Sequence, residues 1–132
     1  MVSREEAEKF GADFERANVW DALSEFYLDT ELDERDKERI AGTLARSPFS
    51  LEELRYIELF EVHPVCIPNL FCVAGVWGGF SADWLIPRCL RLQQRKPFSE
   101  KRLQGLGYRF WNRVVPTIID RKRIEELRAS ST

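Results

Sequence analysis

Apolar side chains recur at every third or fourth position of residues 12–28, and this spacing constrains the fold more than any other feature of the sequence. The recurring positions are Phe14, Ala17, Trp20, Leu23 and Tyr27. This period predicts a helix that buries one face. Asp21, Glu25 and Asp29 follow one another at intervals of four, so they form an acidic ridge on another face of the same helix.

The clearest helix start is FSLEEL, at residues 49–54. Ser50 and Glu53 fit a capping box, in which each side chain accepts a hydrogen bond from the backbone of the other residue. Phe49 and Leu54 stand at the two positions of a hydrophobic staple. We therefore expect a well-defined helix from residue 51.

Asp33, Ser81 and Ser99 are credible caps for further helices. The signals together predict helices near 33–47, 51–62, 82–95 and 100–114, with another beyond Pro116. Strand signals are weak. The sequence thus predicts an all-α fold, a compact single-domain helical bundle of about five to seven helices.

The length of 132 residues suits one domain, because a chain of this size can bury a single sizeable core. We expect this domain to span 1–132, with 1–12 and 129–132 as frayed ends. The first residues lack the basic and apolar regions of a secretory signal. We therefore expect a cytoplasmic protein with reduced thiols.

Charge is unevenly distributed along the chain. Residues 1–62 carry 17 acidic and 8 basic side chains, whereas residues 63–132 carry 5 acidic and 12 basic ones. In one interpretation the two halves pack together and partly neutralise each other. In the other, one charged face meets a charged partner, because such fields steer association and select partners.

The uncharged run HPVCIPNLFCVAGVWGGF, residues 63–80, holds the only histidine and two of the three cysteines. The cysteine spacing does not fit a structural zinc site. Apolar neighbours around Cys66 would raise the pKa of its thiol, which disfavours a nucleophile paired with His63. Prolines and glycines interrupt any membrane-spanning helix. We expect buried core, no catalytic residue, no metal, no cofactor and no membrane partner, and hence no enzyme.

Trp77 and Phe80, in GVWGGF, leave two possibilities open. They can fold back over the core, or they can form an exposed aromatic anchor for a partner, since Trp is enriched at binding hot spots.

Residues 88–113 interleave basic and aromatic side chains. The basic ones are Arg88, Arg91, Arg95, Lys96, Lys101, Arg102, Arg109 and Arg113, and the aromatic ones are Tyr108, Phe110 and Trp111. Basic groups can meet phosphates, and aromatic rings can stack on bases. A small nucleic-acid-binding or regulatory domain is therefore the alternative function, although the sequence pI near 5.6 counts against it.

About half of the chain resembles a family of small, uncharacterised bacterial all-helical domains. The matching pieces are WDALSEFYLDTEL at 20–32, SPFSLEELRYIELFEVHPV at 47–65, PNL at 68–70, GVWGGF at 75–80 and DWL at 83–85. Such domains are similar to immunity proteins of secreted toxins of the polymorphic or type VI kind. The resemblance implies a non-enzymatic protein that binds and neutralises a cognate toxin.

An immunity protein needs a stable scaffold and a complementary surface rather than catalytic residues. An acidic surface would suit a basic toxin such as a nuclease. The predicted partner-binding residues are Asp21, Glu25, Asp29, Glu31, Asp33, Glu34 and Asp36. The pattern makes no prediction of the oligomeric state.

Overall fold

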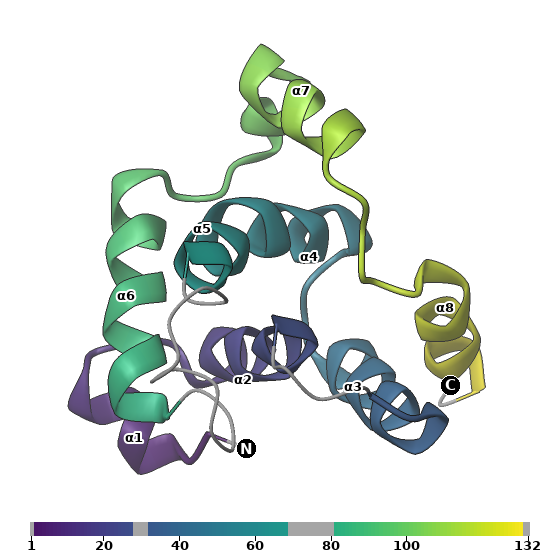
Figure 1. The fold of residues 1–132 in the computed structure, drawn as a ribbon, viewed down its shortest axis with the longest axis horizontal. Coiled ribbons are helices and arrows are strands. Elements are labelled where there is room, and N and C mark those ends of the chain that lie inside the picture. Colours follow the sequence, from purple (N-terminus) through teal and green to yellow (C-terminus); the bar gives the residue numbers. More distant parts are fainter. Residues whose placement is uncertain (1, 28–31, 69–80, 131–132) are drawn as a thin grey trace.

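Helices joined by short connections make up residues 2–27, 32–68 and 81–130, which are the residues that the computed structural model describes (Figure 1). No strand occurs in these ranges, and the prediction of an all-α single domain is confirmed. The elements, in chain order, are α1 (Arg4–Lys9), α2 (Phe14–Ser24), η1 (Glu25–Tyr27), α3 (Glu34–Arg46), α4 (Leu51–Ile57), η2 (Glu58–Val62), α5 (His63–Cys66), α6 (Ala82–Arg95), η5 (Glu100–Gln104), α7 (Leu106–Val114) and α8 (Arg121–Ser130).

Most of the predicted caps are present. Ser50 accepts a hydrogen bond from the Glu53 backbone, and Ser81 accepts one from the Trp84 backbone. Asp33 caps α3 and forms a reciprocal capping box with Asp36. These side chains satisfy amide groups that have no partner within the first turn of a helix.

The segment 51–62 is not one regular helix. It continues from α4 into a π-helical turn, η2, in which the His63 backbone donates to the Glu58 carbonyl five residues earlier. Pro64 lies in the first turn of α5, where the missing N–H of proline costs no helical hydrogen bond. The predicted helix 51–62 therefore ends in a π-helical turn that leads directly into α5.

The segment 100–114 is also divided. It begins as the 3₁₀ helix η5, and α7 starts only after Gly105, whose backbone is extended. Ser99 makes no side-chain capping bond. Gly105 and Gly107 weaken a continuous helix here, because glycine loses more backbone freedom than other residues on entering a helix.

Helix α2 lies in the middle of the molecule rather than on its surface (Figure 1). It contacts α3, α6 and η2, and it buries side chains around much of its circumference. Trp20 and Leu23 are fully buried, together with Ile57 and Leu85 of neighbouring helices. The prediction of one buried and one solvent-exposed face is therefore too simple, because α2 is buried on several sides.

The two ends of the domain are helical. Segment 1–12 is predicted to fray, but within it Arg4–Lys9 forms α1, and Val2 and Ala7 are buried against the core. At the other end, α8 packs on α3. Among the described residues, no helix has both the length and the apolar character needed to cross a bilayer.

Candidate protein-binding surface

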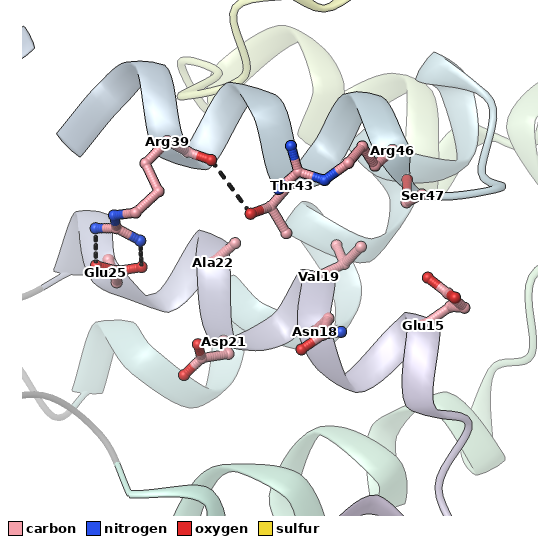
Figure 2. Close-up of a pocket in the computed structure, with 10 residues that line it drawn as sticks. All are labelled: Glu15, Asn18, Val19, Asp21, Ala22, Glu25, Arg39, Thr43, Arg46 and Ser47. Atoms are coloured by element: carbon pink, nitrogen blue, oxygen red, sulfur yellow. Dashed lines mark hydrogen bonds and ion pairs between the residues drawn. The ribbon is translucent and has the colours of Figure 1, made fainter. Parts of the chain in front are cut away.

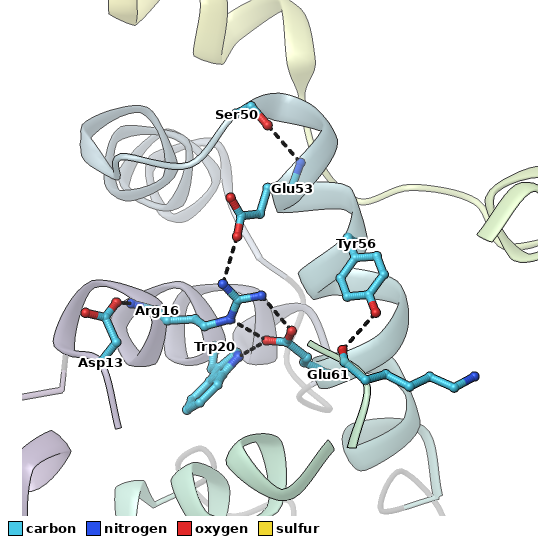
Figure 3. Close-up of polar contacts among 8 residues, drawn as sticks. Asp13, Arg16, Trp20, Ser50, Glu53, Tyr56 and Glu61 are labelled. Carbon is cyan, nitrogen blue, oxygen red and sulfur yellow. Dashed lines mark hydrogen bonds and ion pairs between the residues drawn. The ribbon is translucent and has the colours of Figure 1, made fainter. Parts of the chain in front are cut away.

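Two buried charge clusters flank the helix formed by α4 and η2. In the first, Arg16 of α2 donates to both oxygens of Glu61, at 2.9 and 2.7 Å, and to Glu53 at 2.9 Å (Figure 3). The indole of Trp20 donates to Glu61 at 2.8 Å. Burial alone would lower the pKa of Arg16, but the hydrogen bonds and charges of the two carboxylates outweigh it and raise that pKa.

In the second cluster, Arg55 pairs with Glu58 at 2.7 Å. Arg55 also donates to the side chain of Asn112 and to the carbonyl of Val115, while Glu58 accepts bonds from Thr117 and from the Ile118 backbone. This cluster therefore fastens the end of α7 and the connection to α8 onto α4. Every buried side-chain nitrogen or oxygen among the described residues has a hydrogen-bond partner, so both clusters act as fastenings between helices.

The five predicted acidic residues that the structure describes lie in different settings. Asp21 and Glu25 line a groove of about 310 Å³ between α2 and α3 (Figure 2). Glu25 accepts two hydrogen bonds from Arg39 of α3, at 3.0 and 2.7 Å. Burial raises the pKa of Asp21.

The remaining acidic positions are divided between capping and open surface. Asp33 and Asp36 cap α3, and Asp36 also approaches Arg39 at 3.5 Å. Glu34 is 95% exposed and pairs with Lys37 at 3.6 Å. Asp29 and Glu31 lie outside the described residues. The structure thus brings Asp21 and Glu25 together at α2 and places Glu34 apart from them on α3.

The two oppositely charged halves of the sequence meet in the fold. Glu38 of α3 accepts from Arg123 of α8 at 2.9 and 3.0 Å, and Arg121 approaches Glu52 at 3.4 Å. The hydrogen bonds of Arg123 hold the pKa of Glu38 below its usual range. Mutual neutralisation, the first of the two interpretations of the charge pattern, is present at the α3 to α8 contact.

His63, Cys66 and Cys89 lie in or beside the core. Burial raises the pKa of Cys66 to about 12 and raises that of Cys89, so both stay protonated thiols at neutral pH. The His63 ring nitrogen Nδ1 lies 3.1 Å from the Tyr27 hydroxyl. No group of three or more potential metal ligands was found in the described ranges, and Cys72, Trp77 and Phe80 lie outside them.

The basic and aromatic segment 88–113 is divided among α6, η5 and α7. Arg88 of α6 is occupied locally, since it donates to the Trp84 carbonyl at 2.8 Å and its guanidinium lies 4.4 Å from the centre of the Trp84 ring. The aromatic residues belong instead to α7, which directly follows η5 and lies beyond α4 at one end of the molecule (Figure 1).

Helix α7 turns an apolar face to solvent. The exposed fractions are 82% for Leu106, 56% for Phe110, 45% for Trp111 and 49% for Val114. Leu106, Phe110 and Val114 are four residues apart, so they share one side of the helix. These four residues are called the α7 face below.

The opposite edge of α7 rests on the bundle. The Tyr108 ring lies 6.4 Å from the rings of Tyr56 and of Phe60, measured between centroids, and Asn112 is held by Arg55. Because polar or amphipathic side chains make these contacts, the apolar side is left outward. Within the described residues this face is covered by no other helix, since no residue of α7 is buried.

A family described as a domain of unknown function, DUF7079, matches residues 14–127. The chain belongs to the DUF7079 family. The match includes every helix from α2 to α7 and most of α8. No curated protein and no solved structure matches the chain.

Of the α7 face, Phe110 and Trp111 belong to the basic and aromatic segment that the sequence indicates, whereas Leu106 and Val114 were not predicted. The signal that could have identified the face is the interval of four between Leu106, Phe110 and Val114, with Tyr108 and Asn112 on the other side. That pattern predicts an amphipathic helix. It does not tell which side faces the bundle, because Tyr108 and Asn112 make the internal contacts.

Proposed function

We propose that this DUF7079 protein is a non-enzymatic, cytoplasmic protein-binding protein, and that it acts as an immunity protein which binds and neutralises a cognate bacterial toxin. The observation that carries the proposal is the α7 face, an apolar helix side that no described part of the chain covers. Contiguous exposed apolar patches of this kind typically mark sites of protein interaction.

The composition of the α7 face supports protein binding. Phe110 and Trp111 pack edge to face, with ring centroids 5.2 Å apart, and Arg109 and Arg113 stand beside them. Tryptophan and arginine are enriched among residues that dominate binding energy, where neighbouring contacts exclude water. A partner that covers this face would remove several large apolar side chains from water at once.

The rest of the molecule fits a rigid scaffold. The Arg16 and Arg55 clusters tie α2, α4 and the α7 to α8 connection together, and their charges are used internally. Neutralisation of a toxin is the part of the proposal that comes from the resemblance to immunity proteins. The proposed contact surface is the α7 face with its charged edge, in place of the acidic residues around Asp21, because Glu25 already pairs with Arg39.

Co-expression with the product of the adjacent gene tests this function. We expect the wild-type chain to restore growth and to co-purify with that product, and the variant Leu106→Ser/Phe110→Ser to do neither. Glu34→Lys, on the exposed part of the acidic surface, is the matched control and should behave as wild type. Co-purification without restored growth would contradict neutralisation, and failure of both readouts in the wild type would contradict the whole proposal.

Binding of nucleic acid by residues 88–113 remains the alternative proposal. It is supported by Arg109 and Arg113 beside Trp111, but the segment is divided among α6, η5 and α7, and Leu106 and Val114 offer nothing to a phosphate or a base. A mobility-shift assay decides between them. Salt-dependent binding that is lost in Arg109→Glu/Arg113→Glu would favour the alternative.

A further inference from the structure

One edge of the α7 face is positively charged. Arg109 follows Leu106 by three residues and Arg113 follows Phe110 by three, so both guanidiniums adjoin the apolar side. Both side chains are exposed, and neither forms an ion pair with a described residue. Helix α7 itself contains no acidic residue.

The neighbouring chain adds to this charge. Residues 99–116, which run from the start of η5 to Pro116, carry four basic side chains and one acidic one. Elsewhere in the described residues, the basic side chains Arg39, Arg121 and Arg123 already pair with carboxylates. The α7 edge is thus a place where positive charge and exposed apolar surface coincide.

A partner that covers the α7 face must also compensate the positive charges of Arg109 and Arg113. Removing a guanidinium from water is costly unless an anionic group accepts its hydrogen bonds. Carboxylates suit arginine well, because two parallel N–H groups can donate to the two oxygens. The partner surface should therefore combine apolar side chains with carboxylates along one side.

We propose that the α7 face binds an acidic amphipathic helix of another protein, with its apolar side against Leu106, Phe110 and Val114 and its carboxylates against Arg109 and Arg113. This inference rests on the proposed protein-binding function and specifies the partner's chemistry. With nine residues at about 1.5 Å each, α7 offers a face roughly 13 Å long, which matches two to three turns of a partner helix. Apolar anchors at i, i+3 or i+4 and i+7 would fit such a face.

A second copy of the chain fits this surface poorly. In an antiparallel two-fold pairing of α7 helices, symmetry places both arginine edges on the same side of the contact, so like charges gather there. In a parallel pairing, the Arg109 and Arg113 edge of each copy meets the Trp111 edge of the other, where α7 supplies no anion. In each arrangement, α7 itself brings no carboxylate to the arginines.

Extended polyanions also fit less well than a short helix. An anionic bilayer or a long nucleic acid would meet more of the protein surface, and the chain as a whole carries a net charge of −2. A helix of a few turns contacts α7 alone. The carboxylates of such a helix can then pair with Arg109 and Arg113 without repulsion from the acidic residues in the first half of the sequence.

Selection from a display library of helical peptides tests the inference. The immobilised full chain is the target, and peptides retained by Leu106→Ser/Phe110→Ser are discarded. We expect the selected peptides to carry apolar residues at i, i+3 or i+4 and i+7, with Asp or Glu beside them. Arg109→Glu/Arg113→Glu should weaken the best peptide by roughly tenfold or more, and replacing the peptide's acids with Lys should restore its binding to that variant.

The control is Arg91→Glu/Arg95→Glu, the same charge change on α6, which should leave peptide affinity unchanged within about twofold. Selection of neutral or basic peptides, or of none that depend on Phe110, would overturn the inference. So would α7-dependent dimerisation in sedimentation, or α7-dependent binding to a single-stranded RNA oligonucleotide or to phosphatidylglycerol vesicles. If the wild type still restored growth with a cognate toxin while one of these outcomes was observed, the proposed protein-binding function would be retained. Only the proposal of an acidic partner helix would be rejected.

Discussion

At the scale of single residues, Glu61 is a carboxylate that is held on both oxygens inside the core. It is fully buried, and its two oxygens accept three hydrogen bonds from Arg16 and Trp20. Removing one partner of a buried pair is far more costly than replacing both, because the remaining charge is left poorly compensated.

The variant Glu61→Gln should therefore lower the free energy of unfolding by about 3 kcal/mol, as measured by urea denaturation. Glu52→Gln is the control, because Glu52 is 54% exposed and lies 3.4 Å from Arg121, and exposed pairs contribute less than about 1 kcal/mol. Equal effects of the two substitutions would show that the Arg16 cluster does not fasten α2 to α4 and η2.

His63 should make stability depend on pH. Burial lowers its pKa, with smaller effects of Glu58, which raises the pKa, and Arg55, which lowers it, so the folded state binds a proton less readily than the unfolded chain. Stability from this group is therefore present above the ordinary pKa of about 6.5 and is lost as the pH falls below it. Protonation also makes both ring nitrogens donors, so Nδ1 can then only donate to the Tyr27 hydroxyl.

We expect the free energy of unfolding of the wild type to fall between about pH 7.5 and pH 5 by more than that of His63→Gln, whose amide oxygen can still accept from Tyr27. Urea denaturation across this range makes the comparison. Parallel curves for the two proteins would show that the imidazole titrates alike in the folded and unfolded states.

At the scale of elements, Arg55 makes the polar contacts that place helix α7, beside the ring contacts of Tyr108. Arg55 donates hydrogen bonds to the Asn112 side chain, the Val115 carbonyl and the Glu58 carboxylate. Glu58 in turn accepts hydrogen bonds from the Thr117 hydroxyl and the Ile118 backbone. Lysine keeps the charge beside Glu58 but cannot reproduce the fork of donors that reaches several acceptors at once.

Arg55→Lys should therefore accelerate amide hydrogen exchange in residues 112–118 by roughly tenfold, with smaller changes in α2. Arg113→Lys, on the exposed edge of α7, is the control and should leave exchange as in the wild type. Unchanged protection in Arg55→Lys would mean that the Tyr108 contacts alone hold α7 in place.

Helix periodicity and capping signals predicted the elements well, because both depend on residues close in sequence. Ser50, Ser81 and Asp33 cap helices as expected. The internal character of α2 could not be read from its own residues, since it depends on the distant Glu61 that neutralises Arg16. The pairing of Glu25 could not be read from its own helix for the same reason, because Arg39 comes from α3.

At the scale of the whole molecule, ion pairs connect the acidic first half of the sequence to the basic second half. Arg123 and Glu38 connect α8 to α3, and Lys9 approaches Asp83 at 3.3 Å between α1 and α6. The α7 face takes no part in these ion pairs. Tyr108 and Asn112 contact the bundle and thereby turn the α7 face outward, and the sequence pattern alone does not reveal these contacts.

Substitutions on the α7 face should therefore separate binding from stability. Phe110→Ser should change the free energy of unfolding by less than about 0.5 kcal/mol, whereas Leu85→Ala, in the fully buried core, should lower it by about 2–5 kcal/mol. Calorimetry or urea denaturation gives both values. A large loss of stability in Phe110→Ser would show that this ring supports the fold rather than a partner.

The affinity of the co-expressed partner for wild type and for Phe110→Ser, measured side by side by calorimetry, tests the central claim most directly. We predict at least roughly tenfold weaker binding by the variant, because a central aromatic anchor would be lost. Equal affinity of the two proteins would contradict the assignment of the α7 face as the binding surface.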